Sequence, residues 1–575
     1  MKGNKAGILT VQYFIEIKFS RLAMKLFLHC MVSFIAFTIH QGAFAQLSRG
    51  GKPIAAAGNL KSSIQWINLD DARVDELLLE DQADAIRGLK NRRIAREIPV
   101  SLNPEQDGTW SWMPDGTRIW RLGIRGKGAM ALGIVFNRYF LEEGARLFLY
   151  DPMKKKVLGA YTHANNKSSA MLPVSYLPGD ELIIQLEMPM ELLVYGELQV
   201  GTVRYAYLPV FQDKSLSDAY FGRADSCNID INCPQGEYFQ GLKRSVVRMI
   251  NAELCTGVLV NNTNEDGKPY IYTAAHCVFN RETGDYQPTV FYFNYESPSC
   301  DGPDGSDQFS IAGATLVSTG DTSENPRDAD SLDFALLELS VTPPDSFMAY
   351  YAGWNRSKSP ANYTIAIHHP RGDVKKISKD YDPPETSYHD DNYLPELVKY
   401  SHWRILEWDL ATTEGGSSGG PLFDQDLLVV GTLTGGAANC VNPVNDYFTK
   451  FDYAWDYYDA PAKQLKHWLD PAGTGTMTLD GYDPLAAAGT APLKEPRPRI
   501  YPNPARQLLH VQNNLPGSGH AEISVFHMAG TLVLQSISTQ TGTHTLDVSQ
   551  LDPGVYILRI RKDQIVYNQR FIIAR

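Results

Sequence analysis

The sequence predicts an all-β fold that is divided into several domains. Short apolar runs alternate with turn-forming residues over residues 46–220, which is typical of strands in a sandwich or barrel. A second strand-rich segment, about 224–484, has longer loops and carries most of the cysteines, and short alternating strands return over 500–575. At roughly 100–200 residues per domain, 575 residues correspond to about three or four domains.

Composition and charge narrow the class of protein. The hydrophobic content of 43%, with 30 Tyr and 23 Phe, can fill real cores, which argues against a largely disordered chain. Acidic residues outnumber basic ones by 65 to 53, giving a net charge of −12. Because affinity for nucleic acid rests on neutralising phosphates, this balance argues against a nucleic-acid partner. No motif calls for a cofactor.

Residues 1–45 are predicted to be an export signal. Met24-Lys25 opens the nearly all-apolar stretch Leu26–Ile39, and Ala43-Phe44-Ala45 gives the small-x-small pattern that precedes signal cleavage. The apolar stretch is shorter than the about 18 residues needed to cross a bilayer, so a removed signal is favoured over a membrane anchor. We expect the start to be Met24, residues 1–23 to be a non-essential extension, and no stable membrane span elsewhere.

Residues 46–223 are predicted to be a propeptide with a β-sandwich-like fold. A short helical start near Asp70–Arg96 comes first, and apolar runs such as Ala131–Phe136 and Arg146–Tyr150 follow. Turn-formers such as Pro178-Gly179-Asp180 separate these runs, as expected between the strands of a sandwich.

The cysteines agree with export. Of the seven, Cys30 lies in the signal, and the other six fall in one region of the chain. An even number in an exported protein indicates disulfides, for which six cysteines allow 15 pairings. Zinc is the alternative, but Cys-x-x-Cys and His-x-x-x-His spacings are missing, so we expect no metal. The six are Cys227, Cys233, Cys255, Cys277, Cys300 and Cys440.

Three stretches of the 224–484 segment carry candidate catalytic residues. A buried-strand pattern runs into His276, Asp333 precedes an apolar strand, and Ser418 lies in a glycine-rich turn. An imidazole can take the proton of a serine hydroxyl, and a buried carboxylate fixes the tautomer of that imidazole. Each residue alone has a commoner structural meaning, but their combination in an exported, disulfide-bearing segment favours a catalytic triad. The N–H groups of Gly416 and Ser418 are the expected oxyanion donors.

Around these residues the sequence resembles the trypsin/chymotrypsin superfamily and, within it, the bacterial lysyl endopeptidases. The signatures are Thr273-Ala274-Ala275-His276-Cys277 and Gly416-Ser417-Ser418-Gly419-Gly420-Pro421. The further matching stretches are Ser226–Asp230, Val260–Thr263, Ala352–Trp354, Ala366–Pro370 and Trp468–Pro471. The resemblance implies a serine endopeptidase with a double β-barrel in residues 224–484. It also implies the disulfides Cys227–Cys440, Cys233–Cys300 and Cys255–Cys277, each worth roughly 2–4 kcal/mol.

The resemblance also implies which residues read the substrate. Where trypsin has an Asp six residues before its nucleophile this chain has Thr412, so another carboxylate must read a basic side chain. Asp446 and Glu414 match the positions that do so in lysyl endopeptidases, and Thr413 is a third candidate. A closed acidic site suits a compact ammonium, whereas a guanidinium needs a broader partner. Cleavage after Lys is therefore predicted. Cleavage after Arg or after both, an inert protease-like binding module, and Asp446 as a mere turn residue are the alternatives.

Two departures bear on activation and tuning. Ser417 precedes the candidate nucleophile where trypsin has an Asp, so a switch driven by a new N-terminal amine is not expected. We expect activation by removal of the propeptide, with self-cleavage at Lys214 and Arg223 as the alternative junction. Thr434 replaces the histidine of the family's Leu-His-Gly-Gly segment. His368 and His369 have no ligand spacing around them and are expected to be structural.

The C-terminal residues carry a second resemblance. After the linker 485–499, the stretches Ile500–Ala505, Met528–Gly530 and Leu551–Ile557 look like the type A sorting domain of type IX secretion cargo. This implies a small β-sandwich at 500–575 and a protein that is secreted or held at the cell surface. A carbohydrate-binding or adhesive module is the alternative. The expected partners are protein or peptide substrates, the propeptide and the type IX secretion machinery.

Overall fold

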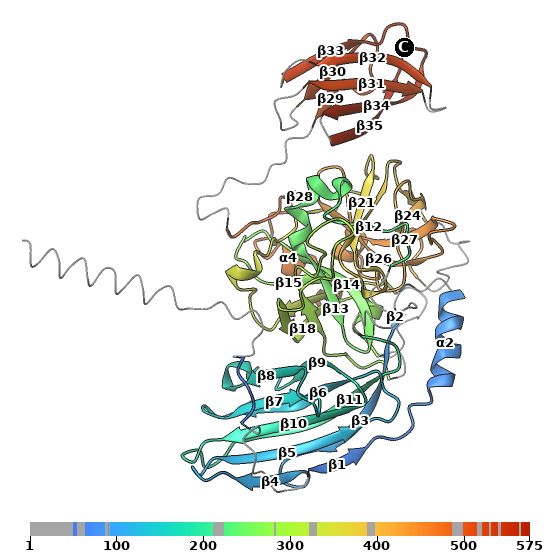
Figure 1. Ribbon diagram of the computed structural model, residues 1–575. Helices are drawn as coiled ribbons and strands as arrows, with labels where there is room; N and C mark the ends of the chain where they lie inside the picture. Colours follow the sequence, from blue (N-terminus) through green and yellow to red (C-terminus); the bar gives the residue numbers. More distant parts are fainter. Residues whose placement is uncertain are drawn as a thin grey trace, which may run out of the picture. The chain divides into compact units, whose positions relative to one another are not determined.

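The computed structural model describes residues 50–54, 64–86, 90, 92–210, 224–280, 283–320, 331–387, 397–485, 498–513, 520–527, 531–538, 542–562 and 565–574. These residues form mainly strands, so the predicted all-β class is confirmed (Figure 1). The export signal, Lys214, Arg223, most of the linker and Met528–Gly530 lie outside the described residues. Among the described helices, none has the length and apolar character needed to cross a membrane.

The first domain is a sandwich of two sheets. One sheet contains β1 (Gln65–Asn68), β4 (Thr109–Trp112), β5 (Arg118–Arg125), β7 (Arg146–Tyr150), β8 (Val157–Tyr161) and β10 (Glu181–Met188). The other contains β3 (Ala95–Leu102), β6 (Ala131–Leu141), β9 (Leu172–Pro178) and β11 (Gly196–Ala206). Fully buried side chains of both sheets, such as Leu122, Leu149 and Phe136, share one apolar core. The apolar runs read from the sequence thus lie in β6 and β7.

The helix of this domain is shorter than predicted. It is α2 (Val74–Ile86), whereas the sequence indicated helix as far as Arg96. Arg92–Arg93 instead form the short strand β2, which pairs with β14 (Glu253–Val260) of the next domain. Backbone pairing with a distant strand has overridden the local helical pattern, which a local pattern cannot reveal.

The region 224–484 contains two large, mainly antiparallel sheets. The first holds β13 (Val246–Ile250), β14, β15 (Tyr270–Thr273), β16 (Val290–Tyr292), β17 (Ser310–Ala312), β18 (Ala314–Thr319) and β19 (Ala335–Leu339). The second holds β12 (Ile229–Asp230), β20 (Trp354–Asn355), β21 (Thr364–His368), β22 (Lys376–Asp380), β23 (Glu385–Thr386), β24 (His402–Glu407), β25 (Pro421–Phe423), β26 (Val429–Gly436), β27 (Val444–Lys450) and β28 (Thr478–Leu479). The short helices α3 (Phe451–Asp456) and α4 (Lys466–Leu469) follow β27.

Apolar clusters hold these two sheets together. One cluster, with Phe291 and Leu337, belongs to the first sheet, and another, with Trp403 and Phe448, belongs to the second. A third cluster contains residues of both, including Tyr272 of β15. The two sheets therefore form one packed unit, as expected for the two halves of a trypsin-like domain.

The C-terminal residues form a small sandwich. Its sheets are β29 (Arg499–Tyr501), β30 (Leu508–Asn513) and β33 (Gly542–Asp547), and β31 (Ala521–His527), β32 (Leu532–Ser538), β34 (Gly554–Lys562) and β35 (Ile565–Ile573). Buried residues from both sheets, such as Val511, Ile523 and Phe571, form its core.

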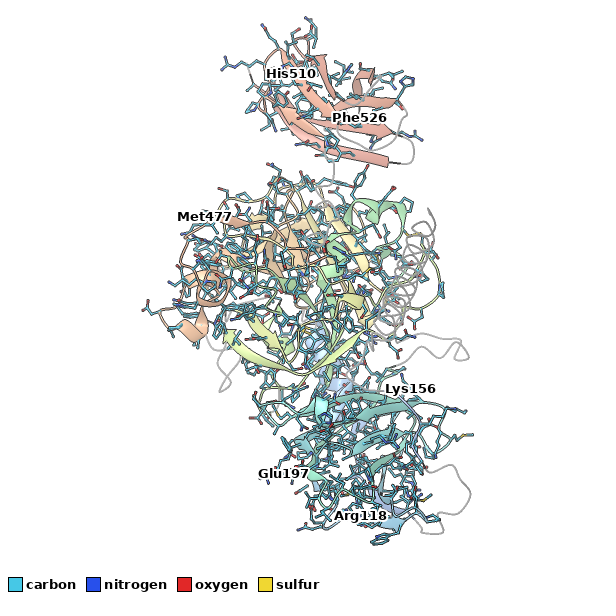
Figure 2. All side chains as sticks on the ribbon, turned by 90° about the vertical axis from the view of Figure 1, so that its left-hand side faces the viewer. Arg118, Lys156, Glu197, Met477, His510 and Phe526 are labelled. Carbon is cyan, nitrogen blue, oxygen red and sulfur yellow. A yellow bond between two sulfur atoms is a disulfide. The ribbon has the colours of Figure 1, made fainter. Side chains whose placement is uncertain are left out.

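The sandwich of residues 64–210 is joined to the 224–484 region by a shared apolar cluster. Ile94, Ala95 and Tyr176 from the sandwich pack with Leu254 and Val374 from the other region. We call this set the interface cluster. Polar contacts surround it: Tyr176 Oη donates to the carbonyl of Asn251 at 2.6 Å, and Lys156, labelled in Figure 2, lies 3.1 Å from Asp307.

Candidate active site

His276 and Asp333 form a pair in loops of the first sheet, where Asp333 is buried and His276 is half-buried. His276 lies in a single 3-10 turn that follows β15, and Asp333 lies just before β19. The His276 Nδ1 is 2.8 Å from one oxygen of Asp333, and the backbone N–H of His276 donates to the other at 3.0 Å. Burial would raise the pKa of Asp333, but the His276 ring and hydrogen bonds from His276 and Thr434 lower it. Asp333 is therefore a carboxylate that fixes the Nδ1–H tautomer and leaves Nε2 as an acceptor.

Ser418 lies in a tight turn between the two sheets. Its carbonyl accepts from the N–H of Thr256 in β14, and the Thr256 hydroxyl donates to the carbonyl of Gly416. Gly416 and Gly419 have φ of +99° and +76°, a region that side chains other than glycine rarely adopt. Ser418 is fully buried, and neither its Oγ nor the Nε2 of His276 has a hydrogen-bond partner among the described residues. The expected hydrogen bond between these two atoms is thus not formed in this structure.

A buried histidine supports this turn from behind. Burial, together with the charges of Lys90 and Lys376, lowers the pKa of His368 to about 3, so its ring is neutral. Its Nε2 lies 3.0 Å from Ser378 Oγ, which itself donates to the carbonyl of Thr412, so Nε2 must be the donor. Its Nδ1 consequently accepts from Ser417 Oγ at 2.7 Å. The hydroxyl of Ser417 also accepts from the N–H of Glu414, so the residue before Ser418 is held without an ion pair.

A second histidine lies near Asp333 from the other side. Thr434 occupies the position where the family sequence has histidine, and its side chain bonds to Asp333. The Nε2 of His402, on β24, lies 3.3 Å from Thr434 Oγ1. Burial lowers the pKa of His402 to about 4, partly opposed by the charge of Asp333. The family's histidine at position 434 is therefore missing here, but the imidazole of His402 on β24 lies in the same region.

Asp446 lies at the bottom of a closed polar site and meets a lysine there. Asp446 is fully buried on β27, and its Oδ2 accepts from Trp408 Nε1 at 2.7 Å and from Thr413 Oγ1 at 2.6 Å. Its Oδ1 faces the Nζ of Lys90 at 2.7 Å. The same Nζ donates to the carbonyls of Thr413 and Ala438, at 2.8 and 2.7 Å. We call Thr413, Ala438 and Asp446 the lysine site.

The surroundings of Lys90 compensate its burial. Lys90 belongs to the sandwich of residues 64–210, yet only 5% of its surface is exposed. Burial lowers the pKa of Lys90, while the charge of Asp446, the hydrogen bond that Lys90 donates to Asp446 and the charge of Glu414 act to raise this pKa. Oxygens gathered around one point suit an ammonium, which carries three donors on one nitrogen.

The backbone of Lys90 reaches the turn that carries Ser418. The N–H of Gly416 donates to the carbonyl oxygen of Lys90 at 2.5 Å. Gly416 is one of the two expected oxyanion donors, so the carbonyl lies where such a donor acts on a reacting carbonyl.

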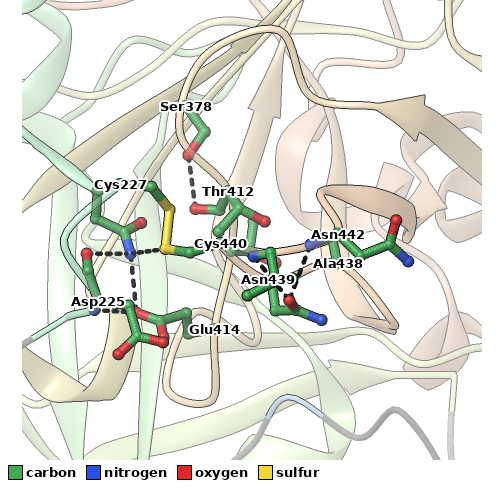
Figure 3. Close-up of a disulfide and its surroundings, with 12 residues drawn as sticks. Asp225, Cys227, Ser378, Thr412, Glu414, Ala438, Asn439, Cys440 and Asn442 are labelled. Carbon is green, nitrogen blue, oxygen red and sulfur yellow. Dashed lines mark hydrogen bonds between the residues drawn. A yellow bond between two sulfur atoms is a disulfide. The ribbon is translucent and has the colours of Figure 1, made fainter.

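Glu414 does not contact Lys90. One of its oxygens accepts from the N–H of Asp225 and from Asn228 Nδ2, each at 2.9 Å, and the other lies 2.9 Å from Arg371 Nη2. Burial raises the pKa of Glu414, against the opposing charge of Arg371. Figure 3 shows Glu414 beside Asp225 and the Cys227–Cys440 disulfide. Glu414 thus acts on the lysine site through its charge alone and holds the turn that carries Cys227.

The disulfides lie around the same site. The structure pairs Cys227 with Cys440, Cys233 with Cys300 and Cys255 with Cys277, the pairs that the resemblance implies. Within the described residues, each cluster of three potential metal ligands takes two of them from one of these disulfides. A disulfide sulfur has no thiolate to offer a metal.

An imidazole whose Nδ1 is held by a buried carboxylate, together with a serine in a turn that presents an N–H group to a carbonyl, suits acyl transfer. The chain is a serine endopeptidase, and residues 224–484 form two packed, mainly antiparallel sheets. Residues 221–451 match the family model of the lysyl endopeptidase C-terminal domain, and residues 499–574 match that of the secretion system C-terminal sorting domain. Both resemblances are confirmed, and the protein is secreted or exported to the cell surface.

Individual proteins are also similar to this chain. A lysyl endopeptidase of Pseudomonas aeruginosa is 29% identical over 409 residues, covering 63% of this chain and 82% of its own length. A solved thermostable serine protease from an extremophilic microorganism is 16% identical with a TM-score of 0.28, covering 36% of this chain and 92% of its own. A solved Glu endopeptidase is 17% identical with a TM-score of 0.25, covering 36% and 85%.

Sequence reasoning missed several residues of the site. Lys90 was not singled out, because many lysines occur before residue 224 and nothing local distinguishes this one. Trp408 and Arg371 were missed because they contact Asp446 and Glu414 through the fold, far along the chain. His368 was expected to be structural, and it is a buried support of Ser417.

Proposed function

We propose that the protein hydrolyses peptide bonds on the carboxyl side of lysine, with His276, Asp333 and Ser418 as its triad. One observation carries the proposal: the Lys90 ammonium lies against Asp446 while the Lys90 carbonyl accepts from the N–H of Gly416. A lysine that fills the specificity site and offers its carbonyl to an oxyanion donor has the position of the residue before a scissile bond.

The proposed reaction follows from these positions. Ser418 Oγ attacks the carbonyl carbon after lysine, and His276 Nε2 takes the hydroxyl proton. The N–H groups of Gly416 and Ser418 stabilise the oxyanion, a contribution worth about 3–4 kcal/mol for one donor. The amine leaves with the proton from His276, and a water molecule then releases the acyl group by the same route.

The specificity follows from charge and shape. Asp446 supplies the negative charge, and the carbonyls of Thr413 and Ala438 supply neutral acceptors. A planar guanidinium is longer and presents its donors as a fork, so it cannot place one nitrogen among these oxygens as an ammonium does. Lysine is therefore preferred over arginine.

The proposed organisation of the chain is that of an exported precursor. A signal (1–45) precedes a propeptide (46–223), the protease domain (224–484), a linker (485–499) and the sorting domain (500–575). The propeptide would bind its own protease domain, and the type IX secretion machinery would bind the tail.

Cleavage-site mapping on a denatured protein mixture tests the function. Processed wild type should cut after lysine alone, and Ser418→Ala should lower the rate by about six orders of magnitude. The Ser418 Oγ has no hydrogen-bond partner among the described residues, so this variant should keep the stability of wild type. Equal cutting after arginine would overturn the lysine assignment, and no cutting by processed, folded wild type would leave an inert binding module.

A further inference from the structure

The residues that follow Lys90 run along a strand of the neighbouring region, and this pairing fixes the direction of the chain. Arg92 and Arg93 of β2 pair antiparallel with Leu254 and Glu253 of β14. The N–H groups of Ile94 and Ala95 then donate to the carbonyl of Ala252, at 2.9 and 3.1 Å. The chain therefore enters the site at Lys90 and leaves it along β14.

The segment that follows Lys90 leaves the site on the side where His276 lies. Leu254 precedes Cys255, and the disulfide from Cys255 to Cys277 ties this strand to the turn that holds His276. In hydrolysis, the amine that leaves must take a proton from the catalytic imidazole, so the chain after the scissile bond has to pass that residue. The segment runs in the direction that a substrate requires.

The segment is also firmly held. The Lys90 side chain is buried in the lysine site, and Ile94 and Ala95 belong to the buried interface cluster. Because the segment and the active site are parts of one chain, its effective concentration is high, and added substrates must compete with it.

From these contacts we propose that the peptide bond after Lys90 is a processing site, which the protease cuts in its own propeptide. Until that bond is cut, Lys90, Arg92 and Arg93 keep other substrates out of the site. This inference rests on the proposed lysine specificity and adds an internal cleavage position far from Lys214 and Arg223.

The step follows the general reaction. Ser418 Oγ bonds to the Lys90 carbonyl carbon, and its proton passes to His276. The bond to the next residue breaks, and the freed amine takes the proton from His276. Water then hydrolyses the ester and leaves a free carboxylate on Lys90. The interface cluster holds the new amino-terminal end at β14, so the fragments separate only when the interface opens.

The test is the appearance of a fragment that ends at Lys90. The full chain of wild type, Ser418→Ala, Lys90→Gln and Lys155→Gln is incubated, denatured and analysed by mass spectrometry for new ends. Lys155 is an exposed lysine of the same domain and serves as the matched control. A lysine-containing reporter peptide is added in parallel.

We expect wild type and Lys155→Gln to yield the fragment at a rate that does not change on dilution, and Ser418→Ala to yield none. Lys90→Gln should lose the fragment, and Lys90→Arg, which keeps the charge if the glutamine variant fails to fold, should form it more slowly. Reporter cleavage by wild type without any end at Lys90 would overturn this inference and leave the proposed function intact. Failure to cut both reporter and propeptide would overturn both.

Discussion

Asp446 is a fully buried carboxylate, and its neighbours determine which of its two oxygens can bind an ammonium group. Trp408 and Thr413 both donate to Oδ2, which turns Oδ1 toward the lysine ammonium. A buried carboxylate held in this way has lost its freedom to reorient, so the ion pair with lysine forms with little further ordering.

Replacing Asp446 tests this arrangement. Asp446→Asn keeps the size of the side chain and removes the charge, so a lysine ammonium would be desolvated without a counter-charge. Since truncating a buried charge pair costs about 2–5 kcal/mol, kcat/KM for lysine peptides should fall by about 30-fold or more. Asp426→Asn, at an exposed acidic residue of the same domain, should leave it unchanged. An unaltered kcat/KM in Asp446→Asn would exclude Asp446 from substrate recognition.

His402 should make the protein sensitive to acid. Its pKa is lowered from 6.5 to about 4, so below pH 6.5 the unfolded chain binds a proton that the folded chain does not. The stability contributed by the neutral ring is present above pH 6.5 and is lost as pH falls toward 4. The neighbouring charges are those of Asp333 and Lys450.

The measurement compares unfolding free energies of inactive Ser418→Ala with and without His402→Gln. Between about pH 6 and pH 4 the difference between them should change by about 1.4 kcal/mol per pH unit, with the histidine protein losing more. The comparison is needed because burial raises the pKa of Asp380 to about 7. The titration of Asp380 therefore makes the unfolding free energy rise as pH falls, which is opposite to the effect of His402. If the unfolding free energies of the two proteins changed with pH in parallel, His402 would not be held neutral in the folded state.

Single residues also mark the limit of what the sequence predicts. His276, Asp333, Ser418 and Asp446 follow from motifs and from a resemblance, because their chemistry restricts the residue types. Lys90 follows from neither. Its role depends on a contact between distant segments, and nothing in the residues around Lys90 distinguishes it from other lysines of the N-terminal segment.

At the scale of elements, the glycine-rich turn is the most constrained part of the site. A Cβ on Gly419 would lie 2.0 Å from Thr273 Oγ1 and 2.3 Å from the carbonyl oxygen of Thr256. Both neighbours belong to strands of the first sheet, so the turn can relax only if the strands β14 and β15 move.

Gly419→Ala is therefore expected to destabilise the protein by more than 2 kcal/mol and to abolish cleavage, since it adds a steric clash to left-handed backbone strain. Gly473→Ala is the matched control: its φ is +64°, but no atom lies within 4 Å of the added Cβ. This variant should cost about 1 kcal/mol and retain activity. Thermal unfolding and reporter cleavage measure both, and equal effects of the two substitutions would refute the steric argument.

Strand periodicity in the sequence predicted individual elements such as β6 and β7. It failed at Arg92–Arg93, where a helical pattern continues but the backbone pairs with β14. Such pairing depends on a strand some 160 residues away, whose edge becomes available only in the folded protease domain.

At the scale of the whole molecule, the interface cluster links the stability of two domains. Ile94 is fully buried there among residues of the protease domain. In inactive Ser418→Ala, the change Ile94→Ala should lower the unfolding free energy by about 2–4 kcal/mol, because it leaves a cavity at the interface. Val194→Ala, at an exposed position of the same domain, should change it by less than 0.5 kcal/mol. Equal unfolding curves would show that the two domains unfold independently.

The turn behind Ser418 has a consequence for the cell that makes this protein. Ser417 is held by a neutral histidine and a backbone N–H rather than by a charge that processing must create, and the N–H of Gly416 already meets a carbonyl in the uncut chain. The glycine-rich turn is thus already formed in the uncut chain, although no hydrogen bond joins Ser418 Oγ to His276 Nε2 there. On the proposed organisation of the chain, substitutions that loosen residues 46–223 would uncover this turn early and expose the producing cell to premature proteolysis.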